Sequence, residues 1–381
     1  MFRRAAMQGR VLVCFAMLTV QTAAAVPMAG NPQNFAGVDL SYVNELEACG
    51  AQYRLGGKTR DPYELFAESG ANLVRLRLWN DPSWTHYSTE SDVTRSIERA
   101  KRAGMQVLLD LHYSDDWADP QKQTIPAAWA KDIDDTDALA KHVYEYTRDV
   151  LARLAQRGLL PYMVQVGNEI NTQMLRPAES TGIPIDWQRN AKILNAGIRA
   201  VREATAADGS HPRVMLHVAQ PENVEPWFTA AAAAGVHDFD YIGVSYYPKW
   251  SKLDLNQAER ALAQVKAKFK ADIIVVEVSY PWTLRDAGDT AANLLGADSL
   301  LRGYPATRDG QQRFMNDVVQ MTLRAGGVGV VYWEPAWVSS SCKTRWGTGS
   351  HWENATLFDF TKKNELTPAA DFLKAIRGLK P

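Results

Sequence analysis

Residues 72–80 read NLVRLRLWN, and this stretch carries the pattern that decides the fold. A short strand-like run of apolar residues and arginines ends abruptly on Trp79 and Asn80, after a helix-like stretch over 62–69. The same order returns in QVLLDLH over 106–112, which follows a helix-like stretch over 93–103. Strand-like runs that alternate with helical periodicity indicate βα units.

Outward from these two units, the pattern extends over almost the whole chain. Strands are predicted at 36–40, 72–78, 106–112, 162–167, 213–218, 241–245, 272–276 and 329–333, with helices at 62–69, 93–103, 135–156, 187–206, 224–234, 256–269, 311–324 and 368–376. Eight βα units predict the α/β class and a single (β/α)8 TIM barrel. A doubly wound open sheet is the alternative, but its Gly-rich turn after the first strand is missing, since Gly56 and Gly57 lie well past that strand.

The first 25 residues are predicted to be a secretory signal peptide, rather than an N-terminal core helix. Arg3, Arg4 and Arg10 flank an apolar run over 11–20, and small residues at 23–25 suit signal cleavage. The apolar run is too short to remain as a membrane anchor. We therefore expect a secreted or periplasmic protein whose catalytic barrel occupies residues 26–381.

Composition excludes some classes of partner. The formal net charge is -1, and it becomes -4 when the three arginines of the signal peptide are removed. No basic field therefore exists to hold nucleic acid or a membrane surface. The expected partner is a polysaccharide, and we expect the protein to be a monomer. The twelve tryptophans exceed what core packing usually needs, and such amphipathic rings often line binding surfaces.

Polar or aromatic residues follow every predicted strand. In a TIM barrel the active site is built at these strand ends, whereas in an arbitrary protein such residues are simply loop. Their presence after all eight strands favours a functional site. They are Asp39, Trp79–Asp81, His112–Asp115, Asn168, Glu169, His217, Tyr246, Tyr247, Glu277, Trp333 and Glu334.

Two of them, Glu169 and Glu277, form the predicted catalytic pair. They stand 108 residues apart, which is three βα units of 36, so they end strands four and seven. Strict alternation puts Glu277 on the same side as Val275 and Ile273, which we expect to fill the barrel interior. Two carboxylates facing one cavity can split a glycosidic bond, one as a proton donor and the other as an ionised nucleophile.

Neighbouring residues receive supporting roles. Arg75 and Arg77 both point inward, and Arg77, nearer the rim, is expected to hold Glu277 ionised while Arg75 only braces the barrel. Asn168 is placed to bind a sugar hydroxyl, and Tyr246 or Tyr247 to orient the nucleophile. Inward-facing Asp110, His112 and His217 suit packed structural groups as well as substrate contacts.

The tryptophans after strand ends predict a groove for a polymer, because their faces can stack on sugar rings. They are Trp79, Trp84, Trp117, Trp250, Trp282, Trp333 and Trp337. The predicted substrate-binding set is Asp39, Arg77, His112, Asn168, Trp117, His217, Tyr246, Tyr247, Trp333 and Trp337.

Other chemistries have weaker support. His112, His217, Asp110 and Glu169 are potential metal ligands, but no HExxH or HxxEH spacing and no Cys cluster occurs. A serine hydrolase lacks its GxSxG elbow. A non-catalytic sugar-binding barrel would not need the pair of glutamates.

At these residues the chain resembles the arabinogalactan endo-β-1,4-galactanases of glycoside hydrolase family 53, from the clan with catalytic glutamates on strands four and seven. The resemblance implies retention, with Glu169 as acid/base and Glu277 as nucleophile, and cleavage within β-1,4-galactan of pectin. It also places Arg77, Asn168, Tyr246 and Trp333 at the reaction centre. Clan members acting on β-mannan, cellulose or xylan are the alternative. The matching stretches are GVDLSYVNELE (37–47), NLVRLRLWNDP (72–82), LLDLHYSDDWADPQKQ (108–123), VQVGNEIN (164–171), IGVSYYPKW (242–250), VVEVSYPW (275–282) and GVVYWEPAWV (329–338).

Two further expectations concern metals and cysteines. Some bacterial members of this family carry calcium in the loop after strand seven, where this chain offers Asp286, Asp289 and Asn293. Three oxygens are too few for a calcium shell, so no metal or other cofactor is predicted. Cys49 follows strand one and Cys342 follows strand eight, its neighbour in a closed barrel, so a disulfide between them is predicted.

Overall fold

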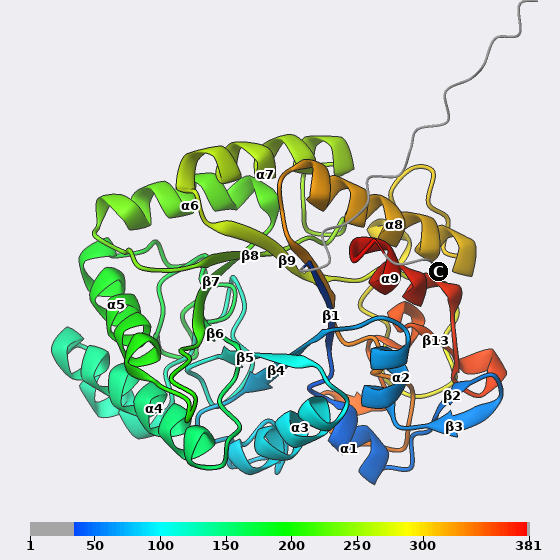
Figure 1. The fold of residues 1–381 in the computed structure, drawn as a ribbon, viewed down its shortest axis with the longest axis horizontal. Coiled ribbons are helices and arrows are strands. Elements are labelled where there is room, and N and C mark those ends of the chain that lie inside the picture. The colour runs from blue at the N-terminus through cyan, green and yellow to red at the C-terminus, as the bar shows by residue number, and fades with distance from the viewer. Residues whose placement is uncertain (1–33, 379–381) are drawn as a thin grey trace, which may run out of the picture.

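The computed structural model describes residues 34–378 and confirms the single (β/α)8 barrel (Figure 1). Eight parallel strands close into a ring in the order β1-β10-β9-β8-β7-β6-β5-β4. The predicted signal peptide lies outside the described residues. The barrel strands are β1 (Phe35–Asp39), β4 (Leu73–Leu78), β5 (Gln106–Leu111), β6 (Met163–Val166), β7 (Arg213–Ala219), β8 (Tyr241–Ser245), β9 (Asp272–Val278) and β10 (Gly329–Tyr332).

Helices surround this ring, and their bounds agree with the predicted ones to within three residues (Figure 1). Many begin at a side chain that caps their free N–H groups, as Asp61, Asp135 and Asp254 do. The predicted last helix is a 3₁₀ turn, η5 (Pro368–Asp371), followed by α9 (Phe372–Ile376). The others are α2 (Pro62–Glu68), α3 (Glu90–Arg102), α4 (Thr136–Gln156), α5 (Trp187–Glu203), α6 (Pro221–Ala233), α7 (Leu255–Phe269) and α8 (Arg308–Arg324).

The barrel interior changes from apolar to polar along the strands. The apolar layer lies toward the strand starts and consists of Phe35, Leu73, Leu108, Met163, Met215, Tyr241, Ile274, Val276 and Val331. Two residues further along, the same alternation turns Arg75, Asp110, Gln165 and His217 inward, all of them buried. The barrel therefore presents a polar floor at the carboxyl ends of its strands.

Strand β9 departs from strict alternation, and the prediction for its inward residues is wrong. Ile274 and Val276 face the interior, whereas Ile273 and Val275 pack in the layer under the helices. The pairing with β8 shifts, because Val244 pairs with Val275 but Ser245 pairs with Glu277. A β-bulge of this kind re-aims the next side chain, and it lets Glu277 follow Val276 to the inner side.

Several short elements were not predicted. Helix α1 (Val43–Ala48) follows β1, and the hairpin of β2 (Tyr53–Leu55) and β3 (Lys58–Arg60) joins β13 (Phe358–Asp359) and β14 (Glu365–Leu366) in a small sheet beside α2 (Figure 1). These strands are too short to show a periodic pattern. The remaining elements are β11 (Lys343–Thr344), β12 (Gly347–Thr348), η1 (Ala127–Asp132), η2 (Ala297–Ser299), η3 (Glu353–Ala355) and η4 (Phe360–Lys362).

The predicted Cys49–Cys342 disulfide is present, with the two Cα atoms 5.3 Å apart. It joins the segment after β1 to the segment after β10, and these two strands are neighbours in the ring. The bond therefore closes the seam of the barrel covalently.

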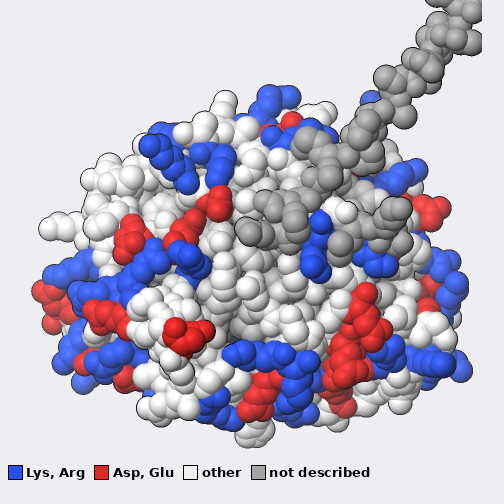
Figure 2. Space-filling view, in the orientation of Figure 1, with Lys and Arg blue, Asp and Glu red and all other residues white. Residues whose placement is uncertain are grey.

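Over the described residues, the surface in Figure 2 carries charges of both signs and shows no large patch of one sign. On the face shown in Figure 2, acidic and basic side chains intermix around the periphery. Within residues 34–378, no helix has the length and apolar character needed to cross a membrane.

Candidate active site

The polar floor opens into a cavity of about 880 Å³, walled by the loops that follow the barrel strands. Seven residues of the predicted catalytic and substrate-binding sets line it, which supports their assignment to one site. They are Trp117, Asn168, Glu169, Tyr247, Glu277, Trp333 and Trp337.

The two glutamates meet across this cavity. A carboxylate oxygen of Glu169 lies within 4.8 Å of one from Glu277. Both side chains are largely buried, with residue exposures of 9% and 6%. Two carboxyl groups so close together ionise one at a time, because like charges at this separation repel each other.

Their surroundings separate their pKa values. Burial and then the neighbouring Glu277 raise the pKa of Glu169 well above its ordinary range, against a hydrogen bond from Ser245. Burial also raises the pKa of Glu277, to about 7, but Arg75 opposes this rise. Glu277 therefore ionises first, and Glu169 keeps the proton.

Arg75, and not Arg77 as predicted, holds Glu277. Its Nη2 lies 2.9 Å from Glu277 Oε1 and 2.9 Å from Asp110 Oδ2, and it donates to Asn168 Oδ1 at 2.7 Å. The prediction assumed that the arginine nearer the rim would reach the nucleophile. The long side chain of Arg75 instead extends along the barrel interior to the centre of the polar floor.

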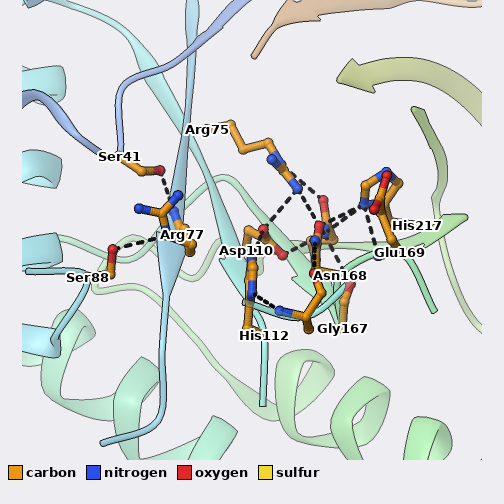
Figure 3. A network of polar contacts seen from close by, with 12 residues as sticks. Ser41, Arg75, Arg77, Ser88, Asp110, His112, Gly167, Asn168, Glu169 and His217 are labelled. Carbon is orange, nitrogen blue, oxygen red and sulfur yellow. Dashed lines mark hydrogen bonds and ion pairs between the residues drawn. The ribbon is translucent and has the colours of Figure 1, made fainter. Parts of the chain in front are cut away.

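Arg77 supports the wall of the cavity. Its Nη1 lies 3.3 Å from Glu334 Oε1, and its guanidinium lies 4.0 Å from the ring centre of Trp117 and 4.7 Å from that of Trp79. Figure 3 shows the two arginines reaching apart, Arg75 toward Asp110 and Asn168 and Arg77 toward Ser88. The predicted contact of Arg77 with substrate is not supported, since it lies beneath Trp117 and does not line the cavity.

Of the two tyrosines, Tyr247 contacts Glu277. Its hydroxyl donates to Glu277 Oε2 at 3.1 Å. Tyr246, predicted for the reaction centre, is fully buried in the outer core and donates to the Leu253 carbonyl at 3.1 Å. Tyr241 faces inward, and alternation along β8 then turns Ser245 and Tyr247 inward and Tyr246 outward.

Three other predicted substrate contacts lie behind the cavity wall. Asp39 pairs with Arg75, at 2.9 Å. His112 contacts Asp110 at 3.0 Å and accepts a hydrogen bond from the Ala118 backbone. His217, also absent from the lining, contacts Ser245 behind Glu169. All three are fully enclosed, so they position the residues that line the cavity.

The aromatic wall differs in part from the predicted set. Trp117, Trp250, Trp333 and Trp337 line the cavity, but Trp79, Trp84 and Trp282 do not. Sequence reasoning missed Trp346, Trp352 and His351, which come from a long loop after β10 without any periodic signal. It also missed the amides Gln121, Asn171, Gln220 and Asn223, although Asn171 follows Glu169 by two residues.

A separate acidic cluster lies in the loops after β9 and β10. Oxygens of Asp286, Asp289 and Glu353 lie within 4.8 Å of one another, and Glu353 Oε2 is buried without a partner. Such hard oxygen donors suit calcium. Asn293 is not in this cluster, and Glu353 was not predicted because it comes from another loop.

A closed (β/α)8 barrel with two buried glutamates within reach of one sugar unit, under an aromatic wall, defines a glycoside hydrolase. Glycosyl hydrolase family 53 matches residues 35–373. The chain belongs to this family and is a glycosidase.

Known proteins agree with this membership. The chain is 50% identical over 372 residues to an arabinogalactan endo-β-1,4-galactanase of Cellvibrio japonicus, covering 97% of this chain and 98% of that protein. The solved family 53 catalytic domain of Ignisphaera aggregans superimposes with a TM-score of 0.81 at 29% identity, covering 92% and 98% of the two chains. A solved fungal β-1,4-galactanase gives a TM-score of 0.75 at 29% identity, over 89% and 98%.

Proposed function

We propose that this protein hydrolyses internal β-1,4 linkages of galactan with retention of configuration. The observation that carries the mechanism is the approach of the Glu169 and Glu277 carboxylates to within 4.8 Å. Retaining enzymes place the two groups about 5–5.5 Å apart, whereas inverting enzymes need about 6.5–9.5 Å to admit a water. The identity of 50% to an arabinogalactan endo-β-1,4-galactanase supports the substrate.

In the first step, ionised Glu277 attacks the anomeric carbon and forms a covalent glycosyl ester. The bond from that carbon to the leaving oxygen breaks, and the leaving oxygen takes the proton of Glu169. Arg75 and Tyr247 hold the carboxylate of Glu277 through both of its oxygens, at 2.9 and 3.1 Å, so its attack is oriented.

In the second step, Glu169 is ionised and acts as a base. It takes a proton from a water whose oxygen attacks the anomeric carbon, and Glu277 leaves as a carboxylate. The product keeps the β configuration, and both glutamates return to their starting protonation states.

The aromatic wall accounts for binding of a polysaccharide. Trp333 and Trp352 lie 4.6 Å apart between ring centres and nearly perpendicular, and both line the cavity. Flat rings of this kind pack against the C–H faces of sugars, and the neighbouring amides bind hydroxyl groups. Galactan strands are expected to lie along this wall.

Export and a monomeric state complete the proposal. The Cys49–Cys342 disulfide supports an oxidising compartment, such as the periplasm or the cell exterior. The predicted signal peptide over residues 1–25 gives the route, and we propose that the mature enzyme acts alone on polysaccharide without a cofactor.

The test is a product assay with two variants. The purified protein should release short β-1,4-galactose oligomers from galactan, with the β-anomer appearing first by NMR, and should leave mannan, xylan and cellulose intact. Glu277→Gln should nearly abolish turnover while galactan binding persists, and Glu259→Gln, on the outer helix α7, serves as the control. Release of the α-anomer, or equal rates in Glu277→Gln and the parent protein, would contradict the mechanism.

A further inference from the structure

We propose that Gln165, His217 and Ser245 form a hydrogen-bond relay that keeps the catalytic proton of Glu169 on its Oε2 atom. This inference rests on the proposed role of Glu169 as acid/base. The three relay residues do not touch substrate and are positioning residues. Figure 3 shows His217 directly beside Glu169 on the polar floor.

The contacts of the relay are short and enclosed. Ser245 Oγ lies 2.5 Å from Glu169 Oε1, and His217 Nε2 lies 2.9 Å from the same hydroxyl oxygen. Ser245, His217 and Gln165 have no exposed surface. Among residues 34–378, no side chain or backbone group donates to Glu169 Oε2, although Glu169 lines the cavity.

Gln165 helps to set the direction of the hydrogen bonds in the relay. Its Oε1 accepts from Arg75 Nε at 3.2 Å, and its Nε2 donates to Asp110 Oδ1 at 2.5 Å, so the orientation of the amide is fixed. Nε2 also lies 3.1 Å from His217 Nδ1, and the backbone N of Glu169 lies 3.3 Å from that same nitrogen. The backbone N–H of Glu169 can only donate, and it points at Nδ1. Asn168 Oδ1 also lies 3.0 Å from Nδ1, but it already accepts from Arg75 Nη2 at 2.7 Å, so we assign Nδ1 as the acceptor of the Glu169 N–H.

The assignment of Nδ1 as acceptor also fixes the hydrogen positions on His217 and Ser245. Burial and the nearby Arg75 hold the pKa of His217 well below its ordinary range, so the imidazole is neutral and carries one proton. With Nδ1 accepting, that proton is on Nε2 and is donated to Ser245 Oγ. The hydroxyl hydrogen of Ser245 is then directed to Glu169 Oε1.

This arrangement selects one oxygen of Glu169 for chemistry. Because Oε1 already accepts a hydrogen bond, the acid form carries its proton on Oε2. The same Oε2 is free to take a proton from water in the second step. The bond from Ser245 stabilises the carboxylate, so it lowers the pKa of Glu169 against the effects of burial.

Other charged groups also face Glu169, and they must stay unchanged in a test. Glu277 and Asp119 raise its pKa, and Arg75 lowers it. Around His217, Arg75 and His112 lower the pKa and Asp110 raises it. Substitutions at Ser245 and His217 leave all of these charges in place.

The experiment measures the titration of Glu169 directly and through activity. In Ser245→Ala, the alkaline limb of kcat/KM against pH should move upward, since the acid form persists to higher pH, and kcat on galactan should fall about tenfold. His217→Leu should move the limb the same way. His217→Gln, whose Nε2–H is placed to donate to Ser245, should restore the parental limb.

A second measurement separates this inference from the proposed function. Carboxyl ¹³C NMR of Glu169 in a Glu277→Gln background needs no substrate, and adding Ser245→Ala should raise the pKa of Glu169 there. Lost activity with an unmoved limb and an unmoved NMR titration would overturn the relay and leave a purely structural role. Absence of galactan cleavage by the parent protein would reject the proposed function while the NMR result still decides the relay.

Discussion

At the scale of single residues, Arg75 connects the fold to the reaction. Its guanidinium meets Asp39, Asp110 and Glu277, and one cation therefore organises three buried carboxylates. Removing such a partner leaves uncompensated buried charge, so the residue braces the barrel and also lowers the pKa of the proposed nucleophile, Glu277. Both roles belong to the same contacts.

The pH profile of activity should show this tuning. Activity requires ionised Glu277 and protonated Glu169, and the pKa values of both are raised. Below the pKa of Glu277 the nucleophile is protonated, and above that of Glu169 the acid is lost. A bell-shaped kcat/KM profile is therefore expected, with both limbs above the ordinary carboxyl value of about 4.3.

Arg75→Lys tests whether Arg75 lowers the pKa of Glu277, and Arg77→Lys is its matched control. An ammonium cannot reach all partners of the Arg75 fork, so the acidic limb should move upward in Arg75→Lys. Arg77 does not contact Glu277, so its variant should leave that limb in place. A shift in Arg77→Lys alone would contradict the pairing described here.

Glu169 should also lower the free energy of unfolding at alkaline pH. Its pKa in the folded protein is raised above that of the unfolded chain, so its favourable contribution is present at acid pH and is lost as pH rises through the folded pKa. Glu169→Gln is neutral throughout. Its free energy of unfolding should exceed that of the parent by about 1 kcal/mol at pH 8.5, with the difference shrinking toward pH 4.5. Chemical denaturation at both pH values measures it, and a difference that grows toward acid pH would refute this sign.

At the scale of elements, the turn after β6 places the proposed acid/base, Glu169, in a backbone conformation that few residues adopt. Gly167 has φ of 85° and Glu169 has φ of 45°. A Cβ on Gly167 would lie 2.6 Å from Ile170 Cγ2, so this position needs glycine for space as well as for its backbone angle. Strain held at such a site is a common feature of catalytic loops.

Gly167→Ala tests this turn, with Gly104→Ala as the control. Gly104 has φ of 75° before β5, but a Cβ there would meet nothing within 4 Å. The control should lose about 1 kcal/mol of stability from the backbone angle alone and keep its kcat. Gly167→Ala should lose more stability and also kcat, because Glu169 is displaced. Equal stability losses and unchanged kcat in both would show that the contact with Ile170 is unimportant.

Sequence patterns located the elements well, but they failed where a strand is irregular. All eight barrel strands follow from apolar runs, because each run is bounded by helical periodicity. The bulge in β9 is invisible in the run before Glu277, since Ile273, Ile274, Val275 and Val276 are equally apolar. The choice of Tyr247 over Tyr246 was accessible, because Tyr241 and Ser245 share its side of β8.

At the scale of the whole molecule, the meeting of Glu169 and Glu277 was predictable, but more than half of the cavity wall was not. Glu169 and Glu277 end strands whose positions in the ring follow from counting βα units. Trp346 and Trp352 reach the cavity from a long irregular segment after β10, and their position depends on packing between loops. No local pattern in the sequence encodes that packing.

The seam disulfide should contribute to stability more than to chemistry. It joins residues 293 positions apart, and removing a native disulfide typically costs about 2–5 kcal/mol. The double variant Cys49→Ser/Cys342→Ser should therefore unfold at lower temperature, with kcat on galactan near that of the parent at 25 °C. An unchanged melting temperature, measured by calorimetry, would contradict this.

The same bond has a consequence for how the protein responds to proteolysis. Because Cys49 and Cys342 bracket most of the chain, a single cut at any loop between them leaves two pieces that remain covalently joined. Most loops around the cavity lie within this bracket, and the segment after Cys342 that carries Trp346 and Trp352 lies outside it. An enzyme nicked within the bracket would therefore migrate as one species until a reducing agent is added.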